Sequence, residues 1–215
     1  MKAKAMGKAT LTLGLMIIVA LFLTSCNGVV TPEVQLNLDE EINKVEEINS
    51  VYLDVPYEKY AGYNWCLPAS GAMAFKYFGE NISQSEIASN VIINGDSSVF
   101  KFISYAKSLG FETKYQSKTI EEIKALLEED IPVIAIQNYS LTLPYSHARV
   151  IIGFDDEKQE IITNDPTAGK DYKISYADFL ALNFNSSPDK CKVIVLSPVE
   201  VDTSNAELID DIDNS

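Results

Sequence analysis

Apolar residues between positions 66 and 130 recur mostly at intervals of three or four, with polar residues between them. This spacing places the apolar side chains on one face of an α-helix. The first expected helix spans 66–78. Pro68 lies within its first turn, where proline is tolerated, and Gly79 is a suitable stop. A second helix should begin at the capping box formed by Ser83 and Glu86.

Two further helices are expected from apolar stripes with a helical period. One ends at Gly110, and the other begins with a capping box of Thr119 and Glu122. The buried faces should be Val99, Ile103, Ala106 and Leu109 in the first of these helices, and Ile120, Ile123 and Leu127 in the second.

The second half of the chain contains four short runs that are rich in β-branched residues and bounded by turn residues, which is typical of strands. The middle two are separated by DEKQ and should form a hairpin. A capping box of Ser175 and Asp178 predicts one more short helix before the last strand. Helices followed by an antiparallel sheet indicate an α+β fold. The expected strands are 132–138, 147–155, 160–165 and 190–197.

Residues 1–25 have the pattern of an export signal. Three lysines precede the uncharged run ATLTLGLMIIVALFL, and small residues lead directly to Cys26. This ending resembles the lipobox of bacterial lipoproteins, which implies cleavage before Cys26 and a lipid anchor on that cysteine. The alternative is an uncleaved membrane anchor with a chance cysteine. Both interpretations place the protein in the bacterial cell envelope, at the outer membrane or cell surface in a Gram-negative cell.

Two acidic segments flank the expected folded domain. Residues 26–50 contain six acidic residues and one lysine, and we interpret them as a tether. Residues 199–215 contain six acidic residues and no basic residue, which predicts a disordered tail. The folded domain should therefore span 51–198.

The charge of the chain argues against one class of partner. Removal of residues 1–25 takes three of the 17 basic residues and none of the 31 acidic ones, so the net charge falls from −14 to −17. A nucleic-acid-binding protein needs a basic surface for the phosphates. We therefore expect no nucleic-acid partner, whereas basic peptides would be attracted.

Cys66 has the sequence context of a reactive thiol. It stands where the first helix begins, and the partial positive charge of a helix N-terminus favours the thiolate, which is the nucleophilic form. An imidazolium would favour it further, and the chain has a single histidine, His147. A base of this kind needs an acceptor for its other ring nitrogen. The predicted hairpin brings Asp165, at the end of one strand, beside His147 at the start of the other.

The two remaining cysteines leave a structural alternative open. In an exported protein Cys66 and Cys191 could form a disulfide. Cys191 alternates with valines in the last strand, which indicates a core position. A zinc site is not expected, because the chain has one histidine and no pair of cysteines at ligand spacing.

The segments CLPASGAMAFKYFG, PVIAIQN, SHARVIIGFD and IITNDP follow one another in this order along the chain. Together these four motifs resemble the papain-like cysteine peptidases, and within them the bacteriocin-processing, double-glycine-leader peptidases. The resemblance implies helices packed on a C-terminal antiparallel sheet, with Cys66 as nucleophile, His147 as base and Asp165 as the orienting acid. It implies a peptide or protein substrate and no cofactor.

The chain departs from this family at two positions. Tyr60 stands where the family usually has a glutamine that donates to the oxyanion, and Leu67 stands where a glycine usually follows the cysteine. The Tyr60 hydroxyl or the Asn64 amide are the candidate replacement donors. The sequence thus predicts a membrane-anchored cysteine peptidase that works through an acyl-enzyme. The alternative is a degenerate papain-like module that binds peptides or proteins at the surface.

Overall fold

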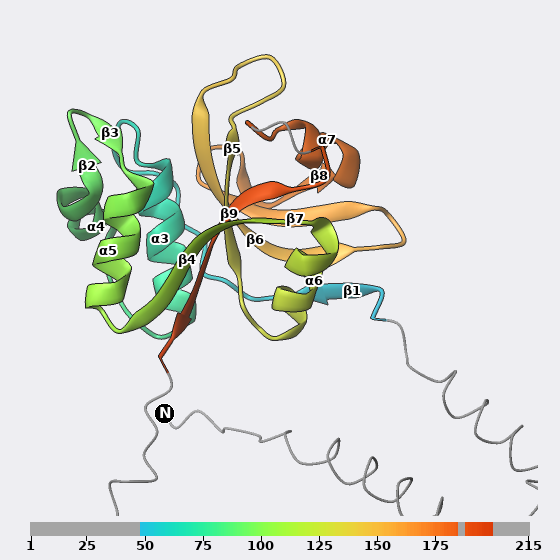
Figure 1. Cartoon of the computed structure of the whole chain (residues 1–215), viewed down its shortest axis with the longest axis horizontal. Coiled ribbons are helices and arrows are strands. Elements are labelled where there is room, and N and C mark those ends of the chain that lie inside the picture. The colour runs from blue at the N-terminus through green and yellow to red at the C-terminus, as the bar shows by residue number, and fades with distance from the viewer. Residues whose placement is uncertain (1–47, 185–187, 200–215) are drawn as a thin grey trace, which may run out of the picture. The chain divides into compact units, whose positions relative to one another are not determined.

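The computed structural model describes residues 48–184 and 188–199 (Figure 1). Within these ranges helices come first and an antiparallel sheet follows, which confirms the predicted α+β class. The expected signal segment 1–25, nearly all of the tether 26–50 and nearly all of the tail 199–215 lie outside the described residues, as does Cys26.

Helix α3 (Cys66–Tyr77) is the central helix of the domain, with every residue from Leu67 to Phe75 buried. Trp65 occupies its N-cap position and makes no capping side-chain hydrogen bond. Gly79 follows the helix end with a φ of +93°, a conformation that glycine adopts without strain. Small side chains let neighbouring helices approach closely, since a Cβ on Gly71 would lie only 2.4 Å from the Phe102 ring.

Helices α4 (Gln84–Val91) and α5 (Val99–Ser108) pack beside α3. They are joined by a small hairpin of β2 (Ile92–Ile93) and β3 (Asp96–Ser97). Ser83 caps α4 as expected, since its hydroxyl accepts from the Glu86 N–H at 3.2 Å.

The predicted buried face of α5 is confirmed at Ala106 and wrong at Ile103 and Leu109. Phe102 and Ala106 are fully buried, Val99 and Ile103 are only partly covered, and Leu109 is exposed. The Phe102 ring fits against Gly71 and packs on Phe75, with ring centroids 5.8 Å apart, so the aromatic side chain rotates the helix toward α3.

Helix α6 (Ile120–Glu128) confirms the sequence interpretation in detail. Thr119 and Glu122 form a complete capping box, and the buried residues are Ile120, Ile123 and Leu127. The last helix, α7 (Tyr176–Ala181), begins after Ser175, whose hydroxyl accepts from the Asp178 N–H.

The main sheet has the strand order β4-β9-β5-β6-β7-β8, and every neighbouring pair is antiparallel. A short seventh strand, β1, pairs with the C-terminal part of β6. The strands are β1 (Ser50–Tyr52), β4 (Phe111–Lys118), β5 (Val133–Asn138), β6 (Ser146–Asp155), β7 (Glu160–Asp165), β8 (Gly169–Ser175) and β9 (Cys191–Pro198).

The sequence did not predict β1, the β2–β3 hairpin, β4 or β8. β4 and β8 are the outer strands of the sheet and carry mostly polar residues. In β8 only Ile174 is buried, so the apolar alternation that identifies a half-buried strand is missing. By contrast, the predicted hairpin of 147–155 and 160–165 is present as β6 and β7.

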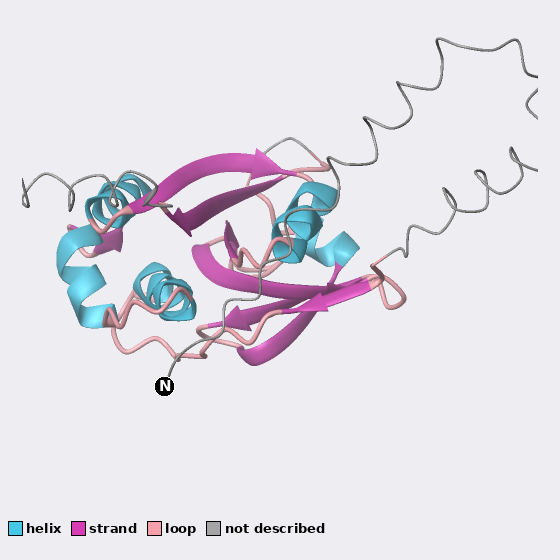
Figure 2. Cartoon of the chain, turned by 90° about the horizontal axis from the view of Figure 1, so that it is seen from below, coloured by secondary structure: helices cyan, strands magenta, loops and turns pink. Residues whose placement is uncertain are grey.

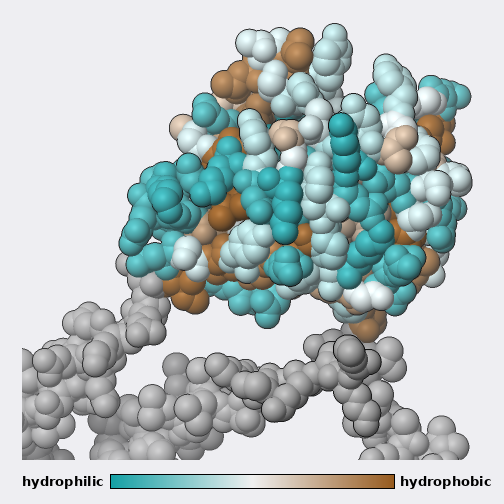
Figure 3. Space-filling view, turned by 180° about the vertical axis from the view of Figure 1, so that it is seen from behind, coloured by the Kyte–Doolittle hydropathy of each residue, from teal (hydrophilic) through white to brown (hydrophobic). Residues whose placement is uncertain are grey.

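Helices α3, α4 and α5 gather on one side of the domain, and the curved sheet lies on the other (Figures 1 and 2). Helix α3 is the contact between them, because it packs on β5 and β6. The loop between β5 and β6 protrudes at the upper edge of the domain, where the space-filling view also shows hydrophobic residues (Figure 3). Leu141 and Leu143 of this loop are 60% and 46% exposed.

Candidate active site

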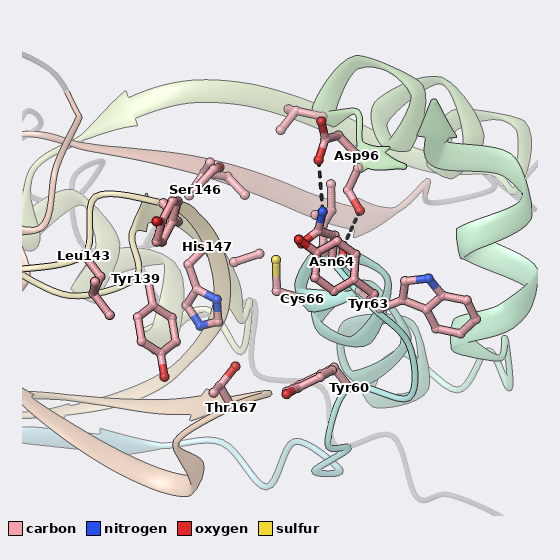
Figure 4. Close-up of a pocket in the computed structure, with 17 residues that line it drawn as sticks. Tyr60, Tyr63, Asn64, Cys66, Asp96, Tyr139, Leu143, Ser146, His147 and Thr167 are labelled. Atoms are coloured by element: carbon pink, nitrogen blue, oxygen red, sulfur yellow. Dashed lines mark hydrogen bonds between the residues drawn. The ribbon is translucent and has the colours of Figure 1, made fainter. Parts of the chain in front are cut away.

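Cys66 is the first residue of α3, and its sulfur lies beside the His147 ring (Figure 4). Burial raises the pKa of the thiol, but the hydrogen bond and charge of His147 lower it. Backbone N–H groups of Ala148 and of Leu67 in the first helical turn lower it further, and the net pKa lies below the ordinary value. Packing of α3 on β6 thus gives the thiol an environment that favours the thiolate.

His147 and Asp165 are buried and in direct contact. The Nε2 atom of His147 lies 3.0 Å from both carboxylate oxygens of Asp165. The ring nitrogen Nδ1 is therefore the one left for the thiol. Oδ1 of Asp165 also accepts from the backbone N–H groups of Thr167 at 2.8 Å and Ala168 at 3.0 Å, so the turn after β7 fixes the carboxylate.

The pKa values of this pair shift in opposite directions. Burial lowers the pKa of His147, but the hydrogen bonds to Asp165 and Cys66 raise it above the ordinary value. Burial raises the pKa of Asp165, but His147, Arg149 and the Ala168 N–H lower it below the ordinary value. The site therefore favours an anionic carboxylate, a cationic imidazole and an anionic thiol.

Arg149 is a residue of this site that the sequence analysis did not single out. It is 2% exposed, and its Nε atom lies 3.3 Å from Oδ2 of Asp165. The register of β6 and β7 pairs Val150 with Asn164, so Arg149 and Asp165 are the next residues along each strand. A β-bulge between Ile151 and Gly153 sets this register, since the same hairpin without it would pair Asp165 with Val150. The sequence signal that could have identified Arg149 is its place as the chain's one arginine, two positions after the one histidine and so on the same face of the strand.

Tyr60 lines the cleft on the side opposite His147, and its hydroxyl points toward Thr167 (Figure 4). The residue is 40% exposed. The backbone N–H of Tyr60 donates to the Pro166 carbonyl at 3.3 Å, which ties its segment to the turn after Asp165.

Gln84 holds the segment that carries Tyr60, and sequence reasoning also missed it. This side chain is 7% exposed, and its amide oxygen accepts from the Ala61 N–H at 3.0 Å. Its amide nitrogen donates to the Lys59 carbonyl at 2.9 Å and to Glu58 at 2.7 Å. A buried amide with all these partners fixes the path of the chain toward Cys66.

Asn64 lies in the cleft, but its amide group is used elsewhere. Its nitrogen donates to the Gly95 carbonyl at 3.3 Å and to Asp96 at 3.0 Å. The residue has a φ of +58°, and its own carbonyl accepts from Ser97. The β2–β3 hairpin therefore occupies both amide hydrogens, which leaves Asn64 without a donor for an oxyanion in this conformation.

The cleft around Cys66 has a volume of about 740 Å³ and is rich in aromatic side chains. One wall comes from the residues before α3, and the other from β6 and the loop before it (Figure 4). Asp96 is the one carboxylate among its described lining residues, and no lysine or arginine lines it. The aromatic residues are Tyr60, Tyr63, Trp65, Tyr139 and Tyr145.

Cys191 has the opposite environment to Cys66. It is fully buried in β9, and burial raises the pKa of its thiol to about 11. Its sulfur contacts the amide nitrogens of Asn183 at 3.4 Å and Gln137 at 3.8 Å. Both cysteines are free in this structure, so the alternative of a Cys66–Cys191 disulfide is not realised here.

Residues 48–184 and 188–199 contain no group of three or more side chains placed to hold a metal ion. Within the same ranges no helix has the length and apolar character needed to cross a bilayer.

Comparison with known proteins identifies both a family and a fold. The model of the family described as "Peptidase_C39 like family" matches residues 52–188. A C39-like peptidase from Bacillus anthracis has a TM-score of 0.56 at 17% identity, covering 71% of this chain and 99% of that one. A search of curated protein sequences finds no match.

Two other solved structures share the fold. A double glycine motif protease from an AMS/PCAT transporter, in complex with the leader peptide, has a TM-score of 0.54 at 22% identity, covering 71% of this chain and 99% of its own. Xylellain, a cysteine protease from Xylella fastidiosa, has a TM-score of 0.51 at 15% identity, covering 71% and 87%. The predicted papain-like fold is confirmed by these similarities.

Proposed function

The chain belongs to the Peptidase_C39 like family, and we propose that its cysteine peptidase-like domain hydrolyses peptide bonds. In this proposal Cys66 is the nucleophile, His147 is the general acid and base, and Asp165 orients the imidazole. The observation that carries the proposal is the contact series from thiol to imidazole to carboxylate, in which the pKa of Cys66 is lowered and that of His147 is raised.

The reaction follows from these charges. The Cys66 thiolate attacks the carbonyl carbon of the scissile bond, and the carbonyl oxygen becomes an oxyanion. The His147 imidazolium then gives its proton to the leaving amine as the C–N bond breaks, which leaves a thioester. A water molecule next loses a proton to His147 and attacks the thioester. Release of the carboxylic acid restores the thiolate and the imidazolium.

An oxyanion needs hydrogen-bond donors at the place where its charge develops. The Cys66 backbone N–H at the start of α3 is one candidate. Tyr60 is the second, because its hydroxyl points into the cleft whereas the Asn64 amide donates to the β2–β3 hairpin. We assign Tyr60 the role that glutamine usually has in the peptidases that this sequence resembles.

The lining of the cleft favours a particular peptide. Five aromatic side chains offer apolar contacts, while Asp96 is the one carboxylate and His147, already opposed by Cys66 and Asp165, is the one cationic side chain among the described lining residues. An anionic peptide would find no unpaired cation among these residues. We therefore propose an extended peptide with apolar residues and a basic residue near Asp96 as the substrate class.

Membrane attachment is a separate part of the proposal and rests on the sequence around Cys26. A lipid on this cysteine would hold the peptidase domain at the surface of the bacterial cell envelope. Expression in a bacterium, followed by detergent partitioning and intact mass, tests it, with Cys26→Ser as the control. A water-soluble wild-type product that begins at another residue would refute it.

A second candidate function is a binding module that has lost catalysis. Tyr60 and Leu67 replace the family's usual glutamine and glycine, and the donors of Asn64 are occupied, which favours this alternative. Such a module would bind peptides in the same cleft without cleaving them.

Labelling with iodoacetamide at pH 6, followed by peptide mass mapping, tests the proposed nucleophile. We expect fast modification of Cys66 and slow modification of Cys191, whose thiol has a pKa of about 11. His147→Ala should slow the reaction at Cys66. Equal slow labelling of both cysteines would refute the triad. Fast labelling of Cys66 without cleavage of any member of a peptide library would favour the binding module.

A further inference from the structure

Arg149 is the only arginine among the 215 residues, which include sixteen lysines, and it stands two positions after the only histidine. It is also one of the largest fully covered side chains of the domain, with 2% of its surface exposed. Charged side chains are rarely buried unless they are paired. The burial of a cation at this position therefore needs a physical explanation.

The contacts of Arg149 join three parts of the site. Its Nε atom forms an ion pair with Oδ2 of Asp165 at 3.3 Å. Its Nη2 atom donates to the carbonyls of Asn138 at 3.4 Å and Tyr139 at 3.1 Å, at the end of β5. Tyr139 in turn packs edge-on against the His147 ring, with centroids 5.2 Å apart. Arg149 thus connects the carboxylate to the residue that supports the imidazole.

Arginine suits this place better than lysine. A guanidinium stays charged when buried, whereas the amine of a buried lysine readily loses its proton. Its planar fork also presents several N–H groups at fixed angles. Here Nη2 donates to two carbonyls, while Nε lies 3.3 Å from the Asp165 carboxylate as an ion pair without a hydrogen bond. The chain uses lysine at all of its other basic positions.

The buried charges of the site sum to zero when Arg149 is included. The thiolate of Cys66 is opposed by the imidazolium of His147, and the carboxylate of Asp165 by the guanidinium of Arg149. Without Arg149 the buried cluster would carry one net negative charge, which a protein interior disfavours.

We propose that Arg149 is a positioning residue of this site that acts through its charge on Asp165 and His147, and that this charge sets the pH range in which the thiolate–imidazolium pair exists. The turn after β7, not Arg149, holds the Asp165 carboxylate in place. The inference rests on the proposed function, since it assumes that Cys66 and His147 form that pair.

The sign of the pH effect follows from one positive charge. A cation lowers the pKa of every neighbouring acid, because it favours the deprotonated form. Arg149 lowers the pKa of His147 in this way, and its guanidinium and the Cys66 thiolate attract each other. The thiolate–imidazolium pair forms when the pH rises above the pKa of the thiol, and it is lost when the pH rises above the pKa of the imidazolium. Removal of Arg149 should therefore move both limits to higher pH.

Other charged groups near Arg149 are few and belong to identifiable elements. Asp165 ends β7, Cys66 begins α3, and two tyrosines lie on either side. Lys173 of β8 and Asp178 of α7 line the same side of the sheet. The groups that face Arg149 or share this space are Cys66, Tyr139, His147, Asp165, Tyr172, Lys173 and Asp178.

Two measurements on the full chain test the inference without a substrate. The pH profile of Cys66 alkylation reports the thiol, and an NMR titration reports the imidazole without ambiguity because the chain has one histidine. We expect Arg149→Gln and Arg149→Met to raise both pKa values by roughly one unit. Arg149→Lys should raise both values by less, because a buried lysine readily loses its proton. Lys114→Met, which removes an exposed cation on β4 at the other edge of the sheet, is the matched control and should change neither value.

The outcomes separate this inference from the proposed function. If the wild-type thiol has an ordinary pKa, the proposed function fails. If the wild-type pair is present but the neutral variants, folded by circular dichroism, leave both values unchanged, the role of Arg149 is overturned. A fall in the His147 value would also overturn it, because a merely structural loss displaces Asp165. If neither neutral variant folds, Arg149→Lys decides, and a folded Arg149→Lys in which neither value rises overturns the inference.

Discussion

Replacement of Asp165 by asparagine removes one charge from the centre of the site and leaves its shape almost unchanged. In the wild type this carboxylate contacts Nε2 of His147 at 3.0 Å through each oxygen and Nε of Arg149 at 3.3 Å. The asparagine amide can still accept from the Thr167 and Ala168 N–H groups. The variant therefore isolates the electrostatic role of the residue from its role in the turn.

The magnitude follows from the hydrogen bond that changes. A hydrogen bond to a charged group is worth about 1.5–3 kcal/mol, against about 1 kcal/mol for a neutral one. The loss of about 0.5–2 kcal/mol corresponds to roughly a 2- to 30-fold decrease in the stability of the imidazolium. The Arg149 charge now acts on His147 without compensation and adds to this decrease. We expect the alkylation rate of Cys66 at pH 7 to fall by about 30-fold.

The pH dependence has a definite sign. The pKa of His147 is raised in the folded protein chiefly by Asp165, so the imidazolium should be lost at lower pH in Asp165→Asn. The upper limit of thiolate reactivity should then move down by about one unit. Iodoacetamide labelling of Cys66 between pH 5 and pH 9, with the NMR titration of His147, measures both effects.

Stability should change as well, because the variant leaves Arg149 buried without its partner. Breaking a buried ion pair from one side costs about 3–5 kcal/mol. The pKa of Asp165 is lowered in the folded state, so its contribution is complete above its unfolded value and is lost as the pH falls through its folded value. Urea unfolding should therefore show a difference between wild type and variant at pH 7 that shrinks below pH 4.

Asp171→Asn is the matched control, since this β8 residue accepts a hydrogen bond from Tyr52 in an exposed position. It should leave the alkylation profile unchanged. If Asp165→Asn behaves like Asp171→Asn, the argument that Asp165 supports the imidazolium is wrong.

Three further changes test other parts of the account. Tyr60→Phe should lower kcat by about 100-fold with little change in KM, because an oxyanion donor acts mainly in the transition state; an unchanged kcat, with a gain in Tyr60→Gln, would show that the donor was missing. Gly71→Ala should lower the free energy of unfolding by about 1–3 kcal/mol, since its Cβ would meet the Phe102 ring at 2.4 Å; Ser89→Ala on the exposed face of α4 is the control for chemical denaturation. Asp96→Asn should raise KM several-fold for peptides with a basic residue and leave neutral peptides unaffected, and equal effects on both would refute the proposed preference.

Local pattern was sufficient for most of the elements in the described domain. The capping box at Thr119 and the stripe of Ile120, Ile123 and Leu127 define α6 without reference to the rest of the chain. The hairpin of β6 and β7 was equally local, and it brings Asp165 near His147. The register that sets Asp165 opposite Arg149 depends on a β-bulge between Ile151 and Gly153, which the sequence analysis did not predict. Short-range periodicity and turn chemistry carry this information, because neighbouring residues fix each other's geometry.

The outer strands of the sheet and the buried face of α5 could not be predicted from local sequence pattern. Outer strand β8 has one buried residue, so solvent exposure removes the alternation that marks a strand. The apolar stripe of α5 predicted that Ile103 and Leu109 are buried. In the structure Phe102 is buried instead, because its aromatic ring fits against Gly71 on another helix. The preference arises from the partner surface, which a sequence pattern does not contain.

The site shows the same division. The sequence by itself determined the candidates Cys66, His147 and Asp165, because a helix start and a hairpin are local features. Only the tertiary structure decided that α3 packs on β6, which brings the thiol to an imidazole 81 residues away. It also decided that the β2–β3 hairpin occupies the Asn64 amide and that Arg149 is covered. Hydrogen-bond partners and burial depend on which surfaces meet, and that is settled by the packing of the whole domain rather than by any one segment.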